Sequence, residues 1–472
     1  MEKGRINRGC MEANTLAIID SSAEFHNHKD SQEAKDDRID FLEAVRTASV
    51  VPENGTPPTK KMVDAVFTIL RAGESLELIM SSYELLNEIE MHFPRVYISE
   101  SSGNAPRELV VVKEAWLPFM VSLDVMSSEK ETDRRKSCPL LDPNGFHELI
   151  LGLAEMAYKT ASQRLDTKFL GNMLLFQYLV NVLEGDFVPH INMYKESLNW
   201  NILRECTLNM LLASRRINYK VLMKDCLYTI CALCQDYAGN YNESECSETS
   251  SEKSSENHNT DVAIALFEVQ RATCMAMQKL LIMSMELDMS KQQAHMLCLT
   301  NRSRSDGVRT PVVEIVLDEL TYHRNILPTF LQVFNDPKWK LEIIVQYLLK
   351  YTKPSVRTRR SNGPSENSTF LGVLKSFSDS SSSRNIIKKL GVEVVQLLLA
   401  HAFLAYMSMA SQQHLAAMPD CNEAVLDSSS VVEISKSVAA AFNSLREVDE
   451  KIQISTLGKE ALFTAAIIIS TL

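Results

Sequence analysis

Three cysteines near the middle of the chain have the spacing of a metal site. Cys226, Cys231 and Cys234 follow the C-x4-C-x2-C pattern of plant-type iron–sulfur ligands. An iron–sulfur cluster also needs a fourth thiolate and a flexible loop, whereas the residues between these cysteines are mostly apolar and typical of a buried helix. Free cysteine in such a helix packs as a small hydrophobic side chain. We therefore predict a packing role for the thiols, with no metal and no cofactor.

Two clusters of cations are the most suggestive polar features. The first lies in a proline-containing segment without an intervening acid and consists of Lys353, Arg357, Arg359 and Arg360. The second is weaker and consists of Arg302, Arg304 and Arg309. Such clusters could contact phosphates or serve as a nuclear import signal. The alternative is a solvated loop without a specific role. The first cluster has no aromatic residue for base stacking, so we predict no reading of base sequence.

Two other patterns have simple explanations. His26 and His28 have the look of a nuclease motif, but they lie in a polar segment without a second set of metal ligands, so we predict no site there. Methionines crowd one predicted helix and could form an adaptable binding face, although we favour the filling of a core. They are Met275, Met277, Met283, Met285 and Met289.

The glycine and histidine positions exclude several enzyme classes. No two of the 15 glycines lie closer than five residues, so neither the dinucleotide fingerprint G-x-G-x-x-G nor the hydrolase elbow G-x-S-x-G is present. Gly4 and Gly9 have the spacing of a P-loop, but Cys10 stands where the phosphate-binding lysine belongs. No histidines form an i, i+4 pair of the H-E-x-x-H type. We therefore predict no enzyme and no catalytic residue.

The elements around these residues begin in a repeated way. Asp142-Pro143, Thr310-Pro311 and Asp336-Pro337 each precede a run with apolar residues at helical spacing. The first residue of each pair can accept hydrogen bonds from free N–H groups at the helix start, and proline fits the first turn. A start that recurs along the chain indicates an array of helices.

Pairs of these helices are joined by very short connections. The pattern predicts a helix over 58–72, a break at Gly73 and a second helix over 75–93, and such neighbours fold back as a hairpin. Similar pairs are predicted at 165–184 with 186–200 and at 202–214 with 218–237. Each hairpin leaves apolar surface that the next can cover, so we predict an armadillo- or HEAT-like solenoid of degenerate repeats. An irregular helical bundle is the alternative.

The composition agrees with an all-α protein that has disordered loops. Glycine supplies 15 of 472 residues, under half of the usual share of about 7%. The net charge of −11 disfavours nucleic-acid binding over the whole surface. Without a visible signal peptide, ten cysteines indicate reduced thiols in the cytosol or nucleus. Apolar runs are too short for a bilayer, so we predict no membrane helix.

Polar stretches divide the chain into blocks. We predict a disordered segment at 1–35, a helical-repeat block at 36–238, an acidic serine-rich linker at 239–260 and a second block at 261–472 that contains a basic loop at 353–369. Shorter breaks are expected at 127–139 and at 379–383. None of these stretches has enough apolar residues to offset the loss of chain entropy.

Several segments resemble a known plant family. They lie at 12–17, 41–46, 51–55, 108–116, 338–342, 353–363 and 458–461. Together they are similar to the family of negative regulators of systemic acquired resistance. The likeness extends from the N-terminal to the C-terminal part, and it is weaker in the insert at 239–260.

This resemblance implies a nuclear, armadillo-like subunit of the structural-maintenance-of-chromosomes five–six complex, in the position of its non-SMC element six. The implied roles are DNA damage repair, homologous recombination and repression of defence-gene transcription. Expected partners are other helical subunits, with weak sequence-independent DNA contact, and no membrane or small-molecule substrate is expected. A cytoplasmic helical-repeat adaptor is the alternative function.

Overall fold

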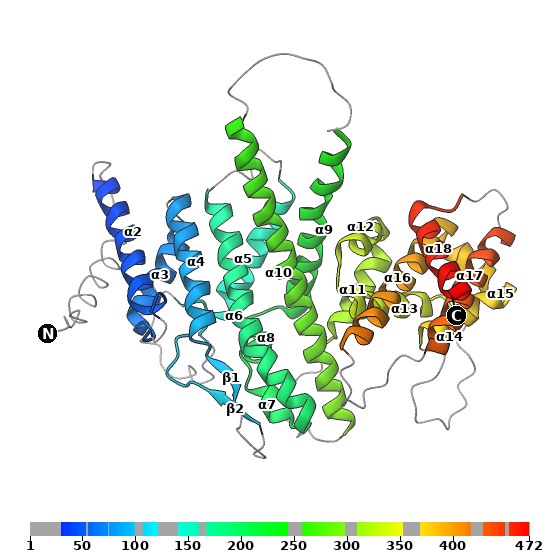
Figure 1. Cartoon of the computed structure of the whole chain (residues 1–472), viewed down its shortest axis with the longest axis horizontal. Coiled ribbons are helices and arrows are strands. Elements are labelled where there is room, and N and C mark those ends of the chain that lie inside the picture. Colours follow the sequence, from blue (N-terminus) through cyan, green and yellow to red (C-terminus); the bar gives the residue numbers. More distant parts are fainter. Residues whose placement is uncertain are drawn as a thin grey trace, which may run out of the picture. The chain divides into compact units, whose positions relative to one another are not determined.

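The structure is a computed structural model that divides into two compact units (Figure 1). It describes residues 30–52, 55–73, 75–99, 107–120, 140–159, 167–243, 257–297, 309–352, 369–416, 428–448 and 453–471. The N-terminal unit runs from Met1 to Val312, and the C-terminal unit from Val313 to Leu472. Helices dominate both units, which confirms the predicted all-α, solenoid-like class.

The N-terminal unit is a row of helices in which each one contacts the next. Its helices are α2 (Asp30–Ser49), α3 (Lys60–Ala72), α4 (Leu76–His92), α5 (Pro143–Ala157), α6 (Thr167–Ser197), α7 (Trp200–Arg204), α8 (Thr207–Leu212), α9 (Tyr219–Glu243) and α10 (Asn257–Met296). Helix α2 contacts α4, α4 contacts α6, α6 contacts α10, α10 contacts α9 and α9 contacts α5. Figure 1 shows α2, α4, α6 and α10 following one another in this order.

Two of the three predicted helix starts are confirmed, those at Asp142 and Asp336, whereas the third helix begins at Val312, one residue after Pro311. Asp142 accepts a hydrogen bond of 2.9 Å from the N–H of Gly145, and Asp336 accepts one of 2.8 Å from the N–H of Trp339. These bonds satisfy N–H groups that have no partner within the helix. The break at Gly73 is confirmed as well, because its φ of 64° is a left-handed conformation that glycine adopts without strain.

Helix α6 differs from the prediction. We expected two helices that meet at residue 185, but α6 continues for 31 residues through Gly185 and Pro189. Pro189 removes the hydrogen bond to the carbonyl of residue 185, and its ring crowds that carbonyl. Packing of α6 against α3, α4, α5 and α10 outweighs that local loss.

A buried amide ties three helices of the row together. Gln177 of α6 accepts a hydrogen bond of 3.1 Å from the hydroxyl of Tyr83 in α4. Its amide nitrogen donates to the carbonyl of Val269 and the hydroxyl of Thr273, both in α10, at 3.1 and 2.9 Å. Because the amide is fully paired, its burial is not penalised and it fixes the register of the three helices.

A short hairpin interrupts the helices, and the sequence analysis did not predict it. Strands β1 (Val96–Ser99) and β2 (Glu108–Val111) pair antiparallel, with Val96 opposite Val111. Both strands contact α6. Six of their eight residues are Val, Ile, Tyr or Leu, which suits a half-buried pleated surface.

The C-terminal unit is built around one apolar helix. Its elements are α11 (Val312–Tyr322, whose first residue still belongs to the N-terminal unit), the 3₁₀ turn Arg324–Ile326, α12 (Leu327–Val333), α13 (Pro337–Leu349), α14 (Phe370–Ser378), α15 (Ser380–Leu390), α16 (Val392–Ala416), α17 (Ser428–Val448) and α18 (Thr456–Thr471). Residues 392–412 of α16 are long and apolar enough to cross a membrane. However, α12, α13, α15, α17 and α18 all contact this helix, so its hydropathy is explained by its place in the core.

The segment boundaries differ from those predicted. Helix α2 starts at Asp30, inside the segment expected to be disordered, and α9 and α10 extend into the expected linker as far as Glu243 and from Asn257. These two helices contact each other within the N-terminal unit, so the compact units divide at 312/313 and not at the linker. Residues 244–256 and 353–368 lie outside the described part of the chain.

The break expected at 379–383 is limited to Asp379, because residues 380–383 belong to a helix. Asp379 is the N-cap of α15, where its carboxylate accepts hydrogen bonds from the N–H groups and hydroxyls of Ser381 and Ser382. These bonds lower the pKa of the Asp379 carboxyl to about 2. A serine run after an aspartate is therefore a helix start here.

Candidate functional sites

Most of the predicted site residues cannot be placed. Lys353, Arg357, Arg359 and Arg360 of the first basic cluster lie outside the described residues. Arg302 and Arg304 of the second cluster lie outside them too. Their roles in nuclear import or phosphate contact therefore stay predictions. Only Arg309 is described, and it belongs to a buried polar cluster.

This cluster, which we call the Asp288 cluster, joins the start of α9, the end of α10 and the start of α11. Two guanidinium nitrogens of Arg309 donate to Asp288 Oδ1 at 3.0 and 2.8 Å. The hydroxyl of Tyr219 donates to Asp288 Oδ2 at 2.8 Å, and the N–H of Val312 donates to the same oxygen at 2.9 Å. The guanidinium lies 4.1 Å from the centre of the Tyr219 ring. Arg309 is therefore bound inside the protein and is not available to phosphates.

Two of the three cysteines, Cys226 and Cys231, have the packing role that the sequence predicts. Cys226 and Cys231 are buried in α9, and the side chain of Cys234 lies outside the described part. Burial raises the pKa of the Cys231 thiol to about 12 and that of Cys226 further. A buried, protonated thiol is neither a nucleophile nor a metal ligand at neutral pH. Among the described residues, no three His, Cys, Asp or Glu side chains are placed to hold a metal ion.

The buried thiols are expected to react slowly with alkylating reagents. In the native chain at pH 8, Cys206, Cys226, Cys231 and Cys274 should react with iodoacetamide about a hundredfold or more slowly than in urea, because reaction requires opening of the core. Peptide mass spectrometry after timed labelling measures each rate. Rapid native labelling of Cys226 or Cys231 would show that α9 is not packed as described.

The methionines divide between core and surface. Met277, Met283 and Met285 are buried, as predicted for core filling. Met275 and Met289 differ, with 50% and 42% of their surface exposed. The helix α10 therefore carries methionine on two faces, and only one of them fills a core.

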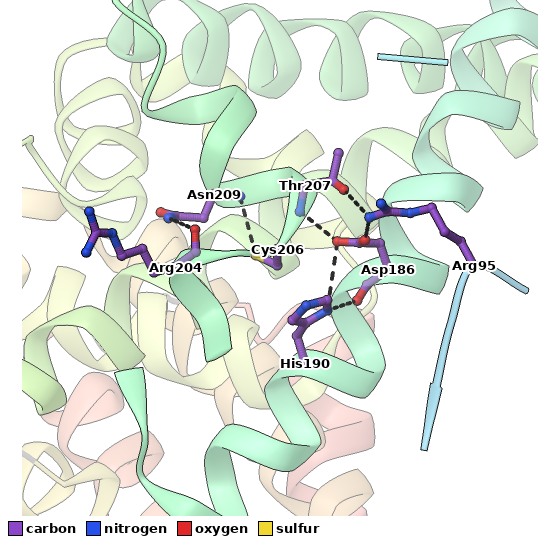
Figure 2. A network of polar contacts seen from close by, with 7 residues as sticks. All are labelled: Arg95, Asp186, His190, Arg204, Cys206, Thr207 and Asn209. Atoms are coloured by element: carbon purple, nitrogen blue, oxygen red, sulfur yellow. Dashed lines mark hydrogen bonds and ion pairs between the residues drawn. The ribbon is translucent and has the colours of Figure 1, made fainter. Parts of the chain in front are cut away.

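A second buried polar network lies where α6, α8 and the hairpin meet (Figure 2). Arg95 donates to Asp186 Oδ1 and, at 2.7 Å, to the hydroxyl of Thr207. The N–H of Thr207 donates to Asp186 Oδ2 at 2.7 Å. The side chain of Asp186 is 1% exposed and that of Arg95 is 18% exposed, so this ion pair is largely removed from water. It holds β1 and the start of α8 against α6.

Asp186, His190 and Cys206 in Figure 2 are the residue types of a nucleophilic triad, but their chemistry differs. Burial raises the pKa of the Cys206 thiol to about 12, and burial together with Arg95 lowers the pKa of His190 to about 4. The Nδ1–H of His190 donates to the main-chain carbonyl of Asp186 at 2.6 Å, and Cys206 Sγ accepts a bond from the N–H of Asn209 as a helix cap. The three residues therefore hold the fold and do not activate a nucleophile.

The neighbouring Glu90 gives the N-terminal unit a pH dependence. A Cβ on Gly185 would lie 3.6 Å from Glu90 Oε1, so the carboxyl is close to the backbone of α6. Burial raises the pKa of Glu90 to about 7, although Arg95 opposes the shift. The folded state therefore holds a proton that the unfolded state releases from about pH 4.5 upward. Protonated Glu90 therefore makes its full contribution to the free energy of unfolding below about pH 4.5, and this contribution is lost as the pH rises to about 7.

Replacing Glu90 by Gln should remove this loss. Relative to the wild type, the variant should gain about 2 kcal/mol of free energy of unfolding as the pH rises from 4.5 to 7. Urea denaturation of both chains at several pH values measures the difference. His190 and His401 change stability with pH in the opposite direction, but they do so equally in both chains, so their effect drops out of the difference. Parallel profiles for the two chains would contradict a buried, protonated Glu90.

The buried networks were missed by sequence reasoning, although one signal was present. Asp186 lies between Glu184 and the apolar residues Phe187 and Val188, and a carboxylate that is buried at such a place needs a cationic partner. The partner, Arg95, is 91 residues away and could not be identified from spacing.

Comparison with known proteins settles the family. The model of the SNI1 middle domain matches residues 94–336, and that of the SNI1 C-terminal domain matches residues 351–472. A curated protein of Arabidopsis thaliana, named negative regulator of systemic acquired resistance SNI1, is 45% identical over 464 residues, which cover 98% of this chain and 95% of the relative. This chain belongs to the SNI1 family. The resemblance predicted from short segments is thereby confirmed.

The SNI1-family match can be placed on the two units. The middle-domain region includes the hairpin, the Asp186 network and the Asp288 cluster, and it ends at residue 336 within the C-terminal unit. The C-terminal domain of the family covers α14 to α18. No solved structure matches this SNI1-family chain.

Proposed function

We propose that this chain is a negative regulator of systemic acquired resistance that acts as a non-catalytic helical scaffold. In this proposal it is a subunit of a nuclear structural-maintenance-of-chromosomes five–six complex. Its roles there are DNA damage repair, homologous recombination and repression of plant defence-gene transcription.

One observation carries the proposal. The 45% identity to the SNI1 relative extends over nearly the whole length of both chains, so the two proteins share their domain content. Two structural features support a scaffold in particular. The helices of the N-terminal unit form a row that offers an extended surface, and its buried Asp, His and Cys side chains serve packing. Membership of the complex and nuclear location rest on the family resemblance alone.

The regulatory role can be tested in plants. The full chain, expressed in Arabidopsis thaliana that lacks its SNI1 relative, should return defence-gene transcripts to their repressed level. A matched control that ends at residue 350 lacks the C-terminal family domain and should not do so. A full-length chain that accumulates normally but leaves the transcripts raised would overturn the proposal.

The scaffold role predicts a partner that resists salt. Gel filtration of the chain with subunits of the complex should show co-elution at low and at moderate salt, since apolar burial dominates protein–protein association. A pull-down from nuclear extract with mass spectrometry identifies the subunits. Exclusive recovery of cytosolic partners would instead support the alternative, a cytoplasmic helical-repeat adaptor.

The first basic cluster can be tested as an import signal. Fluorescent fusions in which Arg357, Arg359 and Arg360 are replaced by Ala should lose nuclear retention. The control replaces three exposed cations elsewhere in the C-terminal unit, Lys436, Arg446 and Lys459. Equal nuclear retention of both variants and the wild type would remove the import role from this cluster.

A further inference from the structure

The charge of the chain is distributed unevenly between the two units. The C-terminal unit has 16 basic and 16 acidic residues, whereas the N-terminal unit has 33 basic and 44 acidic residues. The whole net charge of −11 therefore resides in the N-terminal unit. A polyanion that meets the C-terminal unit encounters no net repulsion there, so a local cluster of cations can act on it.

Such a cluster lies on the exposed face of α15. Arg384, Lys388 and Lys389 are exposed, and Arg384 lies one helical turn before Lys388 on the same face. The opposite face, with Ile386 and Ile387, is buried. No residue of α15 is acidic. The helix therefore presents a face that is only cationic and neutral polar.

A fourth cation is held at the end of this helix. A guanidinium nitrogen of the exposed Arg324 donates to the carbonyl of Lys389 at 3.1 Å. Arg324 also acts against the rise in the pKa of Tyr347, so it lies near α13 as well. The contact brings the charge of Arg324 to the end of α15, where Lys388 and Lys389 lie, and a main-chain carbonyl does not neutralise that charge.

The described part of the chain offers these four cations no acidic partner. Within it, none of Arg324, Arg384, Lys388 and Lys389 forms an ion pair, whereas other exposed lysines of the same unit do, such as Lys350 with Asp318 and Lys375 with Glu433. The carboxylate of Asp379 lies at the other end of α15 and is bonded to serines. Favourable interaction with the helix dipole explains cations in the last turn, but it does not explain Arg384 or Arg324.

We propose that Arg324, Arg384, Lys388 and Lys389 form a surface that contacts the phosphate backbone of duplex DNA. Arg384 is separated from Lys388 by about 6 Å and from Lys389 by about 7.5 Å along the helix axis. Phosphates of one DNA strand advance by about 3.4 Å each along the duplex, so the face spans about two of them. The choice of DNA over RNA rests on the proposed function, whereas the phosphate contact does not.

An acidic protein partner fits this face less well. Protein partners are anchored by buried apolar or aromatic side chains. Among the described residues, no large apolar side chain of α15 is exposed, and its outer positions are Ser, Asn, Arg and Lys. Phosphate contacts need no such anchor, because the release of counterions drives them.

Fluorescence anisotropy of the full chain with unrelated 20-base-pair duplexes tests the proposal. The variant Arg384→Ala, Lys388→Ala, Lys389→Ala should bind on the order of tenfold more weakly at 100 mM salt, with a salt slope lower by about 2 to 3. The control Lys436→Ala, Arg446→Ala, Lys459→Ala removes the same charge from α17 and α18 and should bind like the wild type. Circular dichroism and melting should show both variants folded.

The outcomes separate this inference from the proposed function. Equal loss of affinity in both variants would mean a bulk charge effect and would overturn the site. The absence of any DNA binding would also overturn the site. Tighter binding of a glutamate-rich peptide than of the duplex would overturn it as well. Complementation in plants and co-elution with complex subunits do not depend on this surface, so they can succeed when the DNA test fails.

Discussion

Replacing Asp186 by Ala is expected to lower the free energy of unfolding of the chain by about 3–5 kcal/mol. The carboxylate is 1% exposed and accepts hydrogen bonds from Arg95 and from the N–H of Thr207. Without it, the largely buried Arg95 guanidinium loses its hydrogen-bonded counter-charge, and the N–H of Thr207 loses its acceptor. Urea denaturation followed by circular dichroism measures the loss.

Two companion variants show whether the buried charge is the cause. The double variant Asp186→Ala, Arg95→Met should recover much of the lost stability, because it removes the uncompensated charge and keeps an apolar side chain of similar length. Arg107→Ala breaks an ion pair whose side chains are 68% and 47% exposed, and it should cost less than about 1 kcal/mol. An equal loss for Arg107→Ala and Asp186→Ala would be inconsistent with the network in Figure 2.

Replacing Asp288 by Ala should have a similarly large effect, about 3–5 kcal/mol. Its two carboxylate oxygens accept four hydrogen bonds, from Arg309 twice, from Tyr219 and from the N–H of Val312. The variant leaves the N–H at the start of α11 and the guanidinium without acceptors. Hydrogen exchange should therefore show the largest loss of protection at the start of α11 and the end of α10.

A milder variant calibrates this result. Tyr219→Phe removes one of the four hydrogen bonds and keeps the ring under Arg309, so it should cost about 0.5–1.5 kcal/mol. If Asp288→Ala costs no more than Tyr219→Phe, the arginine is not bound in the way described and is free for other contacts.

Helix starts were predictable because their signals are local. Asp142 and Asp336 act on N–H groups three residues away, so a few letters of sequence contain the whole interaction. The same rule should have identified Asp379, where the serine run was interpreted as a break. A serine-rich stretch is ambiguous by composition, and only the preceding aspartate distinguishes a helix start from a loop.

The continuity of α6 was not predictable in this way. Gly185 and Pro189 both disfavour a helix locally. Glycine costs about 1 kcal/mol and proline about 3 kcal/mol relative to alanine. Contacts with four other helices outweigh that cost, and those contacts involve residues far away in the sequence. Short-range patterns describe the ends of elements better than their interiors.

The same distinction between local and long-range contacts applies to the candidate sites. The cations of α15 stand four and five residues apart, so their shared face could have been predicted from the sequence. The contribution of Arg324 could not, because its contact with Lys389 joins residues 65 apart. The partners of Asp186 and Asp288 were hidden for the same reason.

The apolar helix α16 has a consequence during synthesis. Helices α17 and α18 follow it in the chain, so α16 is made before two of the helices that cover it. In that interval its residues 392–412 have the length and hydropathy of a membrane-crossing segment. A nascent chain at this stage is a target for chaperones or for mistaken insertion into a bilayer. A premature stop before α17 would make that stage permanent, and rapid degradation of the product is then expected.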